Sequence, residues 1–178
     1  MADFDYAIKI VLKHEGGYSN HPNDTGKETY RGISRKHHPN WQGWEIVDSC
    51  KPLKDEEIIK DPELEKAVAR FYYKNFWEPN DLAYVQDDNV AKKILDMSVN
   101  MGSTQAITLV QRALEDFGLP VNEDGKMGPV TYNAINSLDA GMLYNKLKAE
   151  SEKFYRALVI KHPKNKVFLN NWVKRANE

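Results

Sequence analysis

The spacing of apolar residues constrains the fold of this chain most, because it follows the period of an α-helix along most of the sequence. In the first segment, apolar side chains stand at positions i, i+4, i+7 and i+8, which places them on one helix face. Similar stripes recur to the end of the chain, and most follow a residue that can cap a helix. These residues are Asp3, Asp61, Asp88, Ser103 and Asp139. The pattern predicts an all-α fold, with at most a small β-hairpin near residues 17–33.

Charge limits the class of partner. The formal net charge of −1 argues against a dedicated nucleic-acid binder. Residues 145–178 nevertheless hold nine Lys or Arg and three Glu, a balance of +6. Such a section either attracts an anionic polymer or forms the lysine-rich solvated face of a helix.

The sequence also indicates where the protein is made. Its one cysteine, Cys50, excludes an intramolecular disulfide and a thiolate metal cluster. The first residues lack the basic and apolar regions of a signal peptide, and no apolar run is long enough to span a membrane. We expect a monomer that is synthesised in the cytoplasm without a signal peptide and does not insert stably into a membrane.

Metal-binding motifs fail in detail. His14-Glu15 begins like the zinc-protease pattern H-E-x-x-H, but Tyr18 replaces the second histidine. The segment around Gly125 is rich in calcium-type ligands, but Thr131 stands where the bidentate acid should be. We therefore expect no metal and no cofactor.

The stretch "KHEGGYSNHPNDTGKETYRGIS", residues 13–34, contains a candidate acid at the end of the first helix. Glu15 comes seven residues after Ile8, which at about 100° per residue returns it to the apolar face. Partial burial and the negative end of the helix dipole both favour a protonated carboxyl, as a general acid requires. Gly16 and Gly17 would end the helix and leave open space in front of that carboxyl.

A second acid follows in a loop. Asp24 would stay ionised there, and one protonated and one ionised carboxyl form the pair that glycosidic cleavage uses. Thr29 could orient a water, and Tyr18 and Tyr30 offer flat faces on which sugar rings pack. The alternative is purely structural: Glu15 marks a helix end and Asp24 belongs to a turn.

The same stretch resembles the signature of glycoside hydrolase family 108, which reads E-G-G-Y/F, then N-x-P-x-D-P-G-G, then T-x-x-G-I. That family includes phage endolysins and bacterial secretion activators, and the spacing of Glu, Asp and Thr is similar to that of phage-type lysozymes. The second half of the chain resembles the peptidoglycan-binding segment found with the family. The matching residues there are "DMSVNMG" at 96–102, "LVQRALEDFG" at 109–118 and "DGKMGPVTYNAI" at 124–135.

The resemblance implies a lysozyme-like helical fold and an N-acetylmuramidase that cleaves the β-1,4 bond between N-acetylmuramic acid and N-acetylglucosamine. The family's catalytic residues fall on Glu15, Asp24 and Thr29, and its G-I pair falls on Gly32 and Ile33. Peptidoglycan glycan strands would be the partner, and the periplasm or cell wall the place of action. The alternative is a non-catalytic peptidoglycan-binding factor that assists secretion or phage assembly.

The resemblance also implies a division of labour. Residues 1–87 would form the catalytic part and residues 88–178 a peptidoglycan-binding helical part, packed as one compact unit. Asn100 is a candidate substrate ligand in the second part, although an Asn before a helix stop is also a common structural residue. The chain departs from the family pattern after Asp24, where Thr25-Gly26 replaces Pro-Gly and Lys27 replaces the next glycine.

Overall fold

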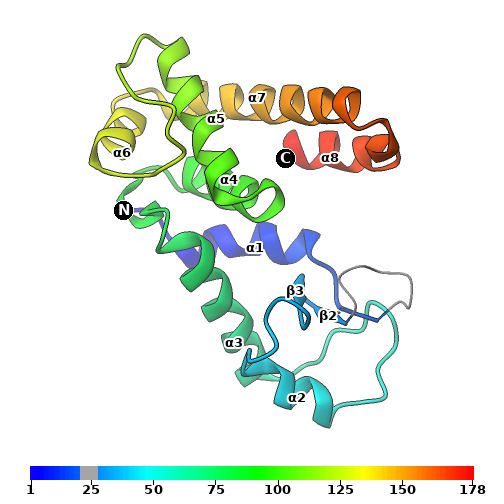
Figure 1. The fold of residues 1–178 in the computed structure, drawn as a ribbon. Coiled ribbons are helices and arrows are strands. Elements are labelled where there is room, and N and C mark those ends of the chain that lie inside the picture. The colour runs from blue at the N-terminus through cyan, green and yellow to red at the C-terminus, as the bar shows by residue number, and fades with distance from the viewer. Residues whose placement is uncertain (21–27) are drawn as a thin grey trace. The chain divides into compact units, whose positions relative to one another are not determined.

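The computed structural model describes residues 1–20 and 28–178, and these residues form two compact units. One unit comprises residues 8–75, and the other comprises residues 1–7 and 76–178. Helices dominate both, and a small three-stranded antiparallel sheet lies in the first (Figure 1). The prediction of a helical, lysozyme-like fold with a small hairpin near residues 17–33 is thus confirmed. The functional boundary near residue 87 stays a prediction.

The unit of residues 8–75 holds the sheet and two short helices. It takes residues 8–14 from the first helix and residues 73–75 from a π-helical turn that continues the third. Its elements are α1 (Phe4–His14), β1 (Tyr18–Ser19), β2 (Thr29–Tyr30), β3 (Ile33–Ser34), α2 (Gly43–Ser49), α3 (Pro62–Tyr72) and η1 (Tyr73–Trp77).

The sheet has two rows of side chains, because neighbouring residues of a strand point to opposite faces. One row pairs Tyr18 with Tyr30 and Tyr30 with Ile33, and all three side chains are buried. The other row pairs Ser19 with Thr29 and Thr29 with Ser34, so that its members all carry hydroxyls. The apolar row anchors the sheet in the core and leaves the hydroxyl row on the wetter face.

Helix α3 begins as its sequence predicts. The Asp61 carboxylate accepts hydrogen bonds from the amides of Glu63 and Leu64, at 2.8 and 2.9 Å, and Pro62 occupies the first turn. Leu64, one of three residues that α3 buries, is fully enclosed in the core. The cap and the apolar stripe together fix the start of α3 and the face it packs inward.

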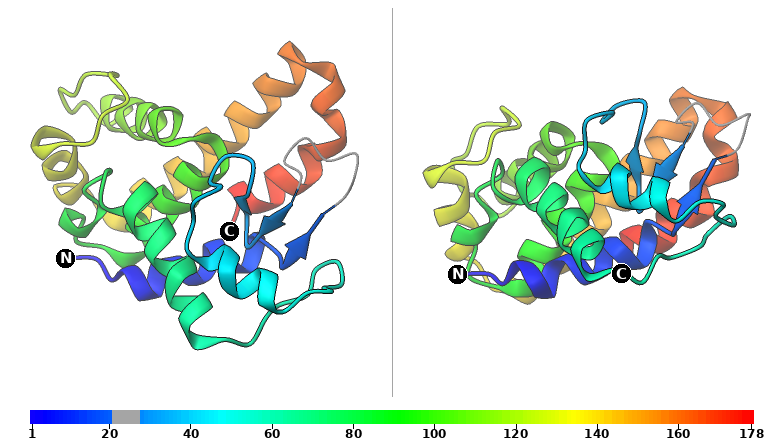
Figure 2. Two further views of the ribbon diagram at one scale, coloured as in Figure 1. Left: turned by 60° about the horizontal axis from the view of Figure 1, so that its bottom comes forward. Right: turned by 90° about the horizontal axis from the view of Figure 1, so that it is seen from below.

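The second unit is wholly helical among its described residues. α4 and α5 follow each other closely, α7 is the longest helix, and α8 folds back along it (Figures 1 and 2). The elements are η2 (Leu82–Tyr84), α4 (Asp88–Met101), α5 (Ser103–Asp116), α6 (Pro129–Asn136), α7 (Ala140–Lys161), η3 (Pro163–Phe168) and α8 (Leu169–Ala176). Their shared core includes Ile94, Ile107, Leu114, Leu143 and Leu147.

The start of α4 differs from the prediction by one residue. The capping side chain is that of Asp87, which accepts from the Val90 amide at 2.9 Å. The predicted cap, Asp88, is the first residue of the helix, and its carboxylate accepts from the amide of Asp3 at 2.7 Å. A contact distant in sequence therefore decides which of two adjacent aspartates caps the helix.

A buried lysine holds the end of α8 against α4. Lys93 is 2 % exposed, and its ammonium donates to the carbonyls of Ala176 and Arg175, at 2.6 and 3.3 Å. Arg175 in turn pairs with the buried carboxylate of Asp96 at 2.9 Å. Burial lowers the pKa of Lys93 to about 8, since the interior disfavours its charged form.

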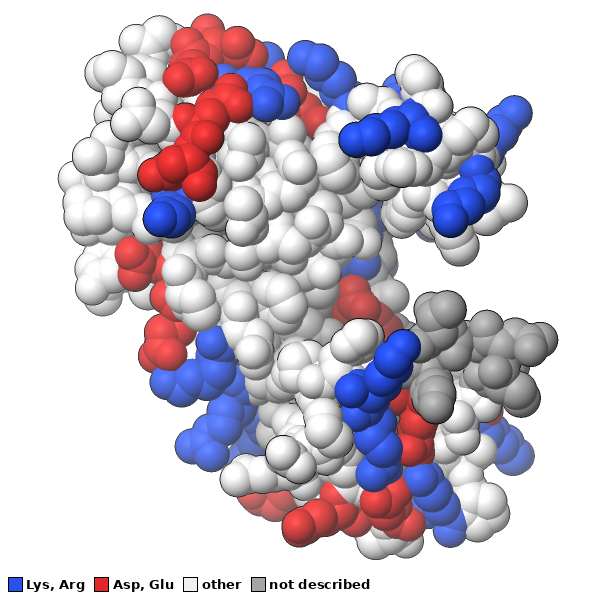
Figure 3. All heavy atoms as spheres, in the orientation of Figure 1, with Lys and Arg blue, Asp and Glu red and all other residues white. Residues whose placement is uncertain are grey.

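The basic character of residues 145–178 is visible on the surface. In Figure 3, Lys and Arg side chains gather near the junction of α7 and η3. Among the described residues, no helix is both long and apolar enough to cross a membrane.

Candidate active site

Glu15 lies directly after the last residue of α1. Its amide still donates to the carbonyl of Val11, at 3.0 Å, so the backbone keeps the helical hydrogen-bond pattern up to this residue. The side chain is half-buried. The helix therefore delivers the carboxyl to a partly enclosed position, as its phase in the sequence predicts.

The two glycines that follow lie close against another segment of the chain. A Cβ on Gly16 would meet the Glu56 carboxylate, and one on Gly17 would overlap the Glu56 carbonyl. The backbone around Glu56 pairs with that of Tyr18, where the Tyr18 amide donates to the Glu57 carbonyl at 2.9 Å. The glycines therefore allow the segment around Glu56 to pack closely against β1. The open space that we expect in front of the Glu15 carboxyl stays a prediction.

The β2–β3 turn supplies the wall on which the Glu15 side chain rests. Arg31 and Gly32 form a two-residue connection with φ of 49° and 75°, the conformation of a tight hairpin turn that demands positive φ at both positions. A Cβ on Gly32 would overlap Oε2 of Glu15 and would lie 2.8 Å from the Tyr72 hydroxyl. Only a glycine lets the turn approach the carboxyl this closely.

Arg31 ties this turn to the end of α1. Its Nη1 donates to the carbonyls of Leu12 and Gly16, at 3.2 and 3.1 Å, which satisfies acceptors that a helix end leaves open. The hydroxyl of Tyr72, on α3, donates to the Arg31 carbonyl at 2.6 Å. The carboxyl of Glu15 is thus held between a helix end and a turn that are fastened to each other.

The structure describes one of the other two predicted catalytic residues. Thr29 lies on β2 in the middle of the hydroxyl row and is half-buried. Asp24 lies outside the described residues. Of the predicted triad, the structure therefore describes Glu15 and Thr29, both in the unit of residues 8–75.

The two tyrosines predicted to contact sugar are core residues. Tyr18 is 7 % exposed and donates to the Glu28 carboxylate at 3.1 Å. Tyr30 is 2 % exposed, and its hydroxyl accepts from the Ile59 amide at 3.1 Å. Burial raises the pKa of both phenols. We assign them to the framework of the site and not to its sugar-contacting surface, because their ring faces are enclosed.

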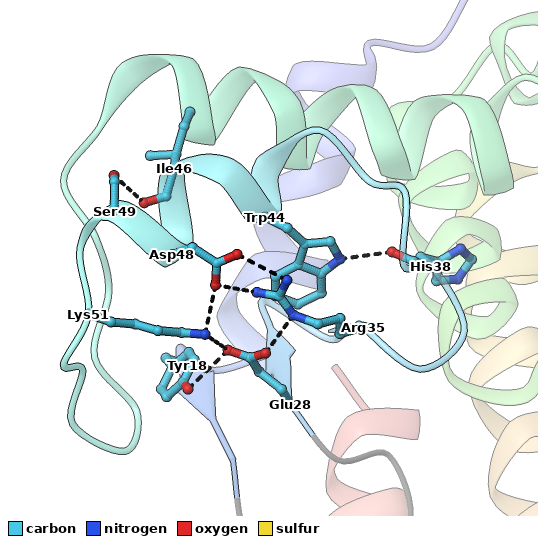
Figure 4. A network of polar contacts seen from close by, with 9 residues as sticks. All are labelled: Tyr18, Glu28, Arg35, His38, Trp44, Ile46, Asp48, Ser49 and Lys51. Carbon is cyan, nitrogen blue, oxygen red and sulfur yellow. Dashed lines mark hydrogen bonds and ion pairs between the residues drawn. The ribbon is translucent and has the colours of Figure 1, made fainter.

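A charged network fixes the start of β2 (Figure 4). The carboxylate of Glu28 pairs with Arg35 at 2.5 Å and with Lys51 at 2.6 Å, and Asp48 of α2 pairs with the same two cations. The guanidinium of Arg35 also lies 4.2 Å from the centre of the Trp44 ring. The network joins the sheet to α2.

Glu28 is unsuited to acid catalysis. Burial opposes its ionisation, but the hydrogen bonds from Lys51 and Tyr18 and the charge of Arg35 outweigh this and lower the pKa of Glu28. A carboxyl that stays ionised cannot donate a proton near neutral pH. Its side chain is 13 % exposed and serves to hold charge partners together.

Asn100 lies in the other unit, near the end of α4. Its amide nitrogen donates to the hydroxyl of Tyr155 on α7. Burial raises the pKa of Tyr155 to about 12. Asn100 thus links two helices in the structure, and a role in substrate binding stays a prediction.

Sequence reasoning missed the residues that position Glu15. Gly32 was matched only as part of a motif, and Arg31 and Tyr72 carried no signal of their own. The clue available in the sequence was the dipeptide "RG", because a glycine-containing pair of this kind between apolar and hydroxyl residues is compatible with a tight hairpin. The structure shows a positive φ at both residues. The network around Glu28 could not be predicted from the sequence, because its partners lie 7 to 23 residues away and only the fold brings them together.

Comparisons with known proteins identify the family and the fold of the chain. Residues 8–102 match the family model described as Glycosyl hydrolase 108, and residues 105–177 match one described as Predicted Peptidoglycan domain. The solved structure of Brucella abortus SagA is similar in fold, with a TM-score of 0.66 and 22 % sequence identity. The similarity covers 97 % of this chain and 88 % of that one. The comparison with curated proteins found no match.

Proposed function

Because the chain belongs to the glycosyl hydrolase 108 family, we propose that it is an N-acetylmuramidase. It would cleave the β-1,4 bond between N-acetylmuramic acid and N-acetylglucosamine in peptidoglycan. The match of residues 105–177 to a predicted peptidoglycan domain supports this substrate. The place of action would be the periplasm or the cell wall, where that polymer is found.

The observation that carries the proposal is the way Glu15 is held. Its carboxyl is half-buried, rests on Gly32, and lies between a helix end and a turn that Arg31 fastens together. A general acid must be held in one position relative to the bond it protonates, and rigid neighbours provide that. A carboxylate that merely marked a helix end would not need such a frame.

We assign the steps as follows. Glu15 protonates the glycosidic oxygen as the bond to the sugar breaks. Asp24 stabilises the positive charge that develops on the sugar ring, and Thr29 orients the water that attacks it. The hydroxyl row around Thr29 offers further donors and acceptors for that water.

The test is lysis of purified peptidoglycan, followed as loss of turbidity, by the wild type and Glu15→Gln. We expect the substitution to lower the rate by about 10²-fold or more, since general acid catalysis contributes that much. Glu45→Gln, on the first turn of α2, is the matched control and should lyse like the wild type. Equal lysis by Glu15→Gln would refute the catalytic assignment.

Analysis of the products identifies the bond. A muramidase releases fragments that end in reducing N-acetylmuramic acid, which borohydride reduction and mass spectrometry detect. Fragments that end in reducing N-acetylglucosamine would instead show a glucosaminidase and would overturn the bond we propose.

A second function is peptidoglycan binding without catalysis, as in an accessory factor for secretion or phage assembly. The match of residues 105–177 to a predicted peptidoglycan domain supports peptidoglycan binding without catalysis as much as it supports hydrolysis. Pull-down of the protein with insoluble peptidoglycan, combined with no lysis by the wild type, would establish this function in place of hydrolysis.

A further inference from the structure

The unit of residues 8–75 contains a cavity of about 430 Å³ that no predicted site residue lines. It is formed by residues 40–42, in the segment that leads into α2, together with α3 and the start of η1. Its size falls within the range of small-ligand pockets, roughly 300–1,000 Å³.

Two aromatic rings form its apolar part. The Trp41 ring stands edge-to-face against Trp44, with centres 5.1 Å apart, and its indole nitrogen donates to the Ala67 carbonyl at 3.4 Å. A Cβ on Gly43 would overlap the Trp41 ring, so the glycine lets the indole pack down on α2. Phe71 completes this part, edge-on to Trp41 with centres 6.5 Å apart. The rings are therefore held in place by the fold.

The polar part is cationic. Arg70 and Lys74 stand four residues apart on successive helical turns, and both are exposed. The remaining polar groups are the side-chain amides of Asn40, Gln42 and Asn75. None of the described residues that line the cavity is acidic. The cavity therefore suits a ligand that carries a carboxylate beside a small apolar group.

The cavity and the proposed catalytic carboxyl lie in the same unit, and both are in contact with α3. Phe71 lines the cavity, and the next residue, Tyr72, donates its hydroxyl to the turn on which Glu15 rests. The rings of Phe71 and Tyr72 lie 5.5 Å apart.

We propose that this cavity binds the peptide stem of peptidoglycan, with a stem carboxylate on Arg70 and Lys74 and an alanine methyl against Trp41 and Phe71. The inference rests on peptidoglycan being the substrate, as proposed above. The stem fits better than the sugars do, because the glycan is uncharged once the lactyl carboxyl is bonded to the stem. Stem peptides, in contrast, carry free carboxylates and the methyl groups of alanine.

Binding of a synthetic stem tetrapeptide ending in D-alanine tests the site directly. We expect it to shift the indole N–H resonance of Trp41 and to leave those of Trp77 and Trp172, in the other unit, unchanged. Arg70→Gln combined with Lys74→Gln should weaken binding about tenfold or more, since each charged hydrogen bond contributes that order. Lys66→Gln is the matched control on the same helix, because Lys66 pairs with Glu63 and does not line the cavity.

Two further ligands distinguish a stem-peptide site from a sugar subsite. The same tetrapeptide with its carboxylates amidated should bind about tenfold more weakly, and chitotetraose, an uncharged sugar, should leave the Trp41 resonance in place. The site would instead be a sugar subsite, and the proposal wrong, if chitotetraose shifted Trp41 and the tetrapeptide did not. Equal affinity of wild type and double variant for the tetrapeptide would also overturn it.

Activity provides a second measurement. The ratio of lysis rates on stem-bearing peptidoglycan and on glycan stripped of stems by an amidase should exceed one for the wild type and fall toward one in the double variant. Tetrapeptide binding to the Glu15→Gln protein separates the two hypotheses. If the wild type lyses nothing but binds the tetrapeptide, hydrolysis fails and the stem site stands. If the wild type lyses both substrates at the same rate and binds no tetrapeptide, the stem site is refuted and the proposed hydrolysis stands.

Discussion

The carboxylate of Glu15 lies against the α-carbon of Gly32, where the side chain of any other residue would overlap it. The two residues are 17 positions apart in sequence, and a tight turn brings them together. The close approach explains why a glycine at this turn matters to a carboxyl at the end of a helix. It also makes the geometry of the proposed acid sensitive to one methyl group.

Gly32→Ala should therefore damage both stability and lysis. The positive φ of 75° disfavours alanine by about 1–2 kcal/mol, and the added methyl also displaces the Glu15 carboxyl. A displacement of about 1 Å at a catalytic group can lower the rate 10²-fold. Urea unfolding and turbidity loss measure the two effects.

Gly118→Ala separates strain from collision. Gly118 has a φ of 81°, and a Cβ added there would have no described neighbour within 4 Å, so the variant suffers the strain alone. We expect it to lose a similar amount of stability and to keep its lysis rate. If Gly32→Ala lysed as fast as Gly118→Ala, the close contact with Glu15 would have no catalytic importance.

Arg31 should affect lysis by positioning the Glu15 carboxyl through its hydrogen bonds, and not by its positive charge alone. Arg31→Lys keeps the positive charge but loses the guanidinium that bonds to the carbonyls of Leu12 and Gly16. We expect Arg31→Ala to lower the free energy of unfolding by about 1–3 kcal/mol and Arg31→Lys to recover part of it. Both should reduce lysis without changing the affinity for the stem tetrapeptide, measured by the Trp41 resonance.

The Glu28 network makes the free energy of unfolding depend on pH in the acidic range. Because the pKa of Glu28 is lowered in the folded state, its contribution is present above the ordinary value of 4.5 and is lost as pH falls through the folded value. Glu28→Gln should lower the unfolding free energy at pH 7 by about 1–3 kcal/mol. Urea unfolding should show this difference shrinking below pH 4.5.

Glu63→Gln is the matched control for that experiment. Its ion pair with Lys66 is 73 % exposed on both sides, so its removal should change stability by less than about 0.5 kcal/mol at any pH. An equal loss in the two variants would mean that the Glu28 network is no stronger than a surface ion pair.

Lys93 should give stability the same direction of pH dependence as Glu28, but in an alkaline window. Its folded pKa of about 8 lies below its ordinary value of 10.5, so between these values the unfolded chain holds the proton and the folded chain does not. Stability from this group therefore rises with pH across that window, at up to about 1.4 kcal/mol per pH unit. Relative to Lys93→Met, the wild type should gain stability from pH 8 to pH 10 in urea unfolding; a flat difference would contradict the lowered pKa.

The helices were the most predictable part of the fold. Asp61 and Asp139 cap α3 and α7 as their sequence positions predict, because a cap is a local interaction. Ser103 was expected to cap α5, but Gly102 is the capping residue and the Ser103 hydroxyl accepts from Asn80 at 2.9 Å. Where a polar side chain has a distant partner, local rules cannot tell which contact it makes.

The site was predictable only in part, for a related reason. The phase of α1 locates Glu15, since helix periodicity depends on nearby residues alone. The exposure of Tyr18 and Tyr30 depends on which face of a two-residue strand meets the core, and strands this short carry no periodic signal. The approach of Glu56 to the double glycine is likewise a contact between segments some 40 residues apart.

The two-residue turn between Tyr30 and Ile33 also determines where this protein can be lengthened. An added residue there would shift the strand register by one and would exchange the buried apolar row with the hydroxyl row. A single residue inserted at this turn should therefore destabilise the unit. The segment Pro163–Phe168, which buries no side chain, is a site where a guest sequence can be accommodated.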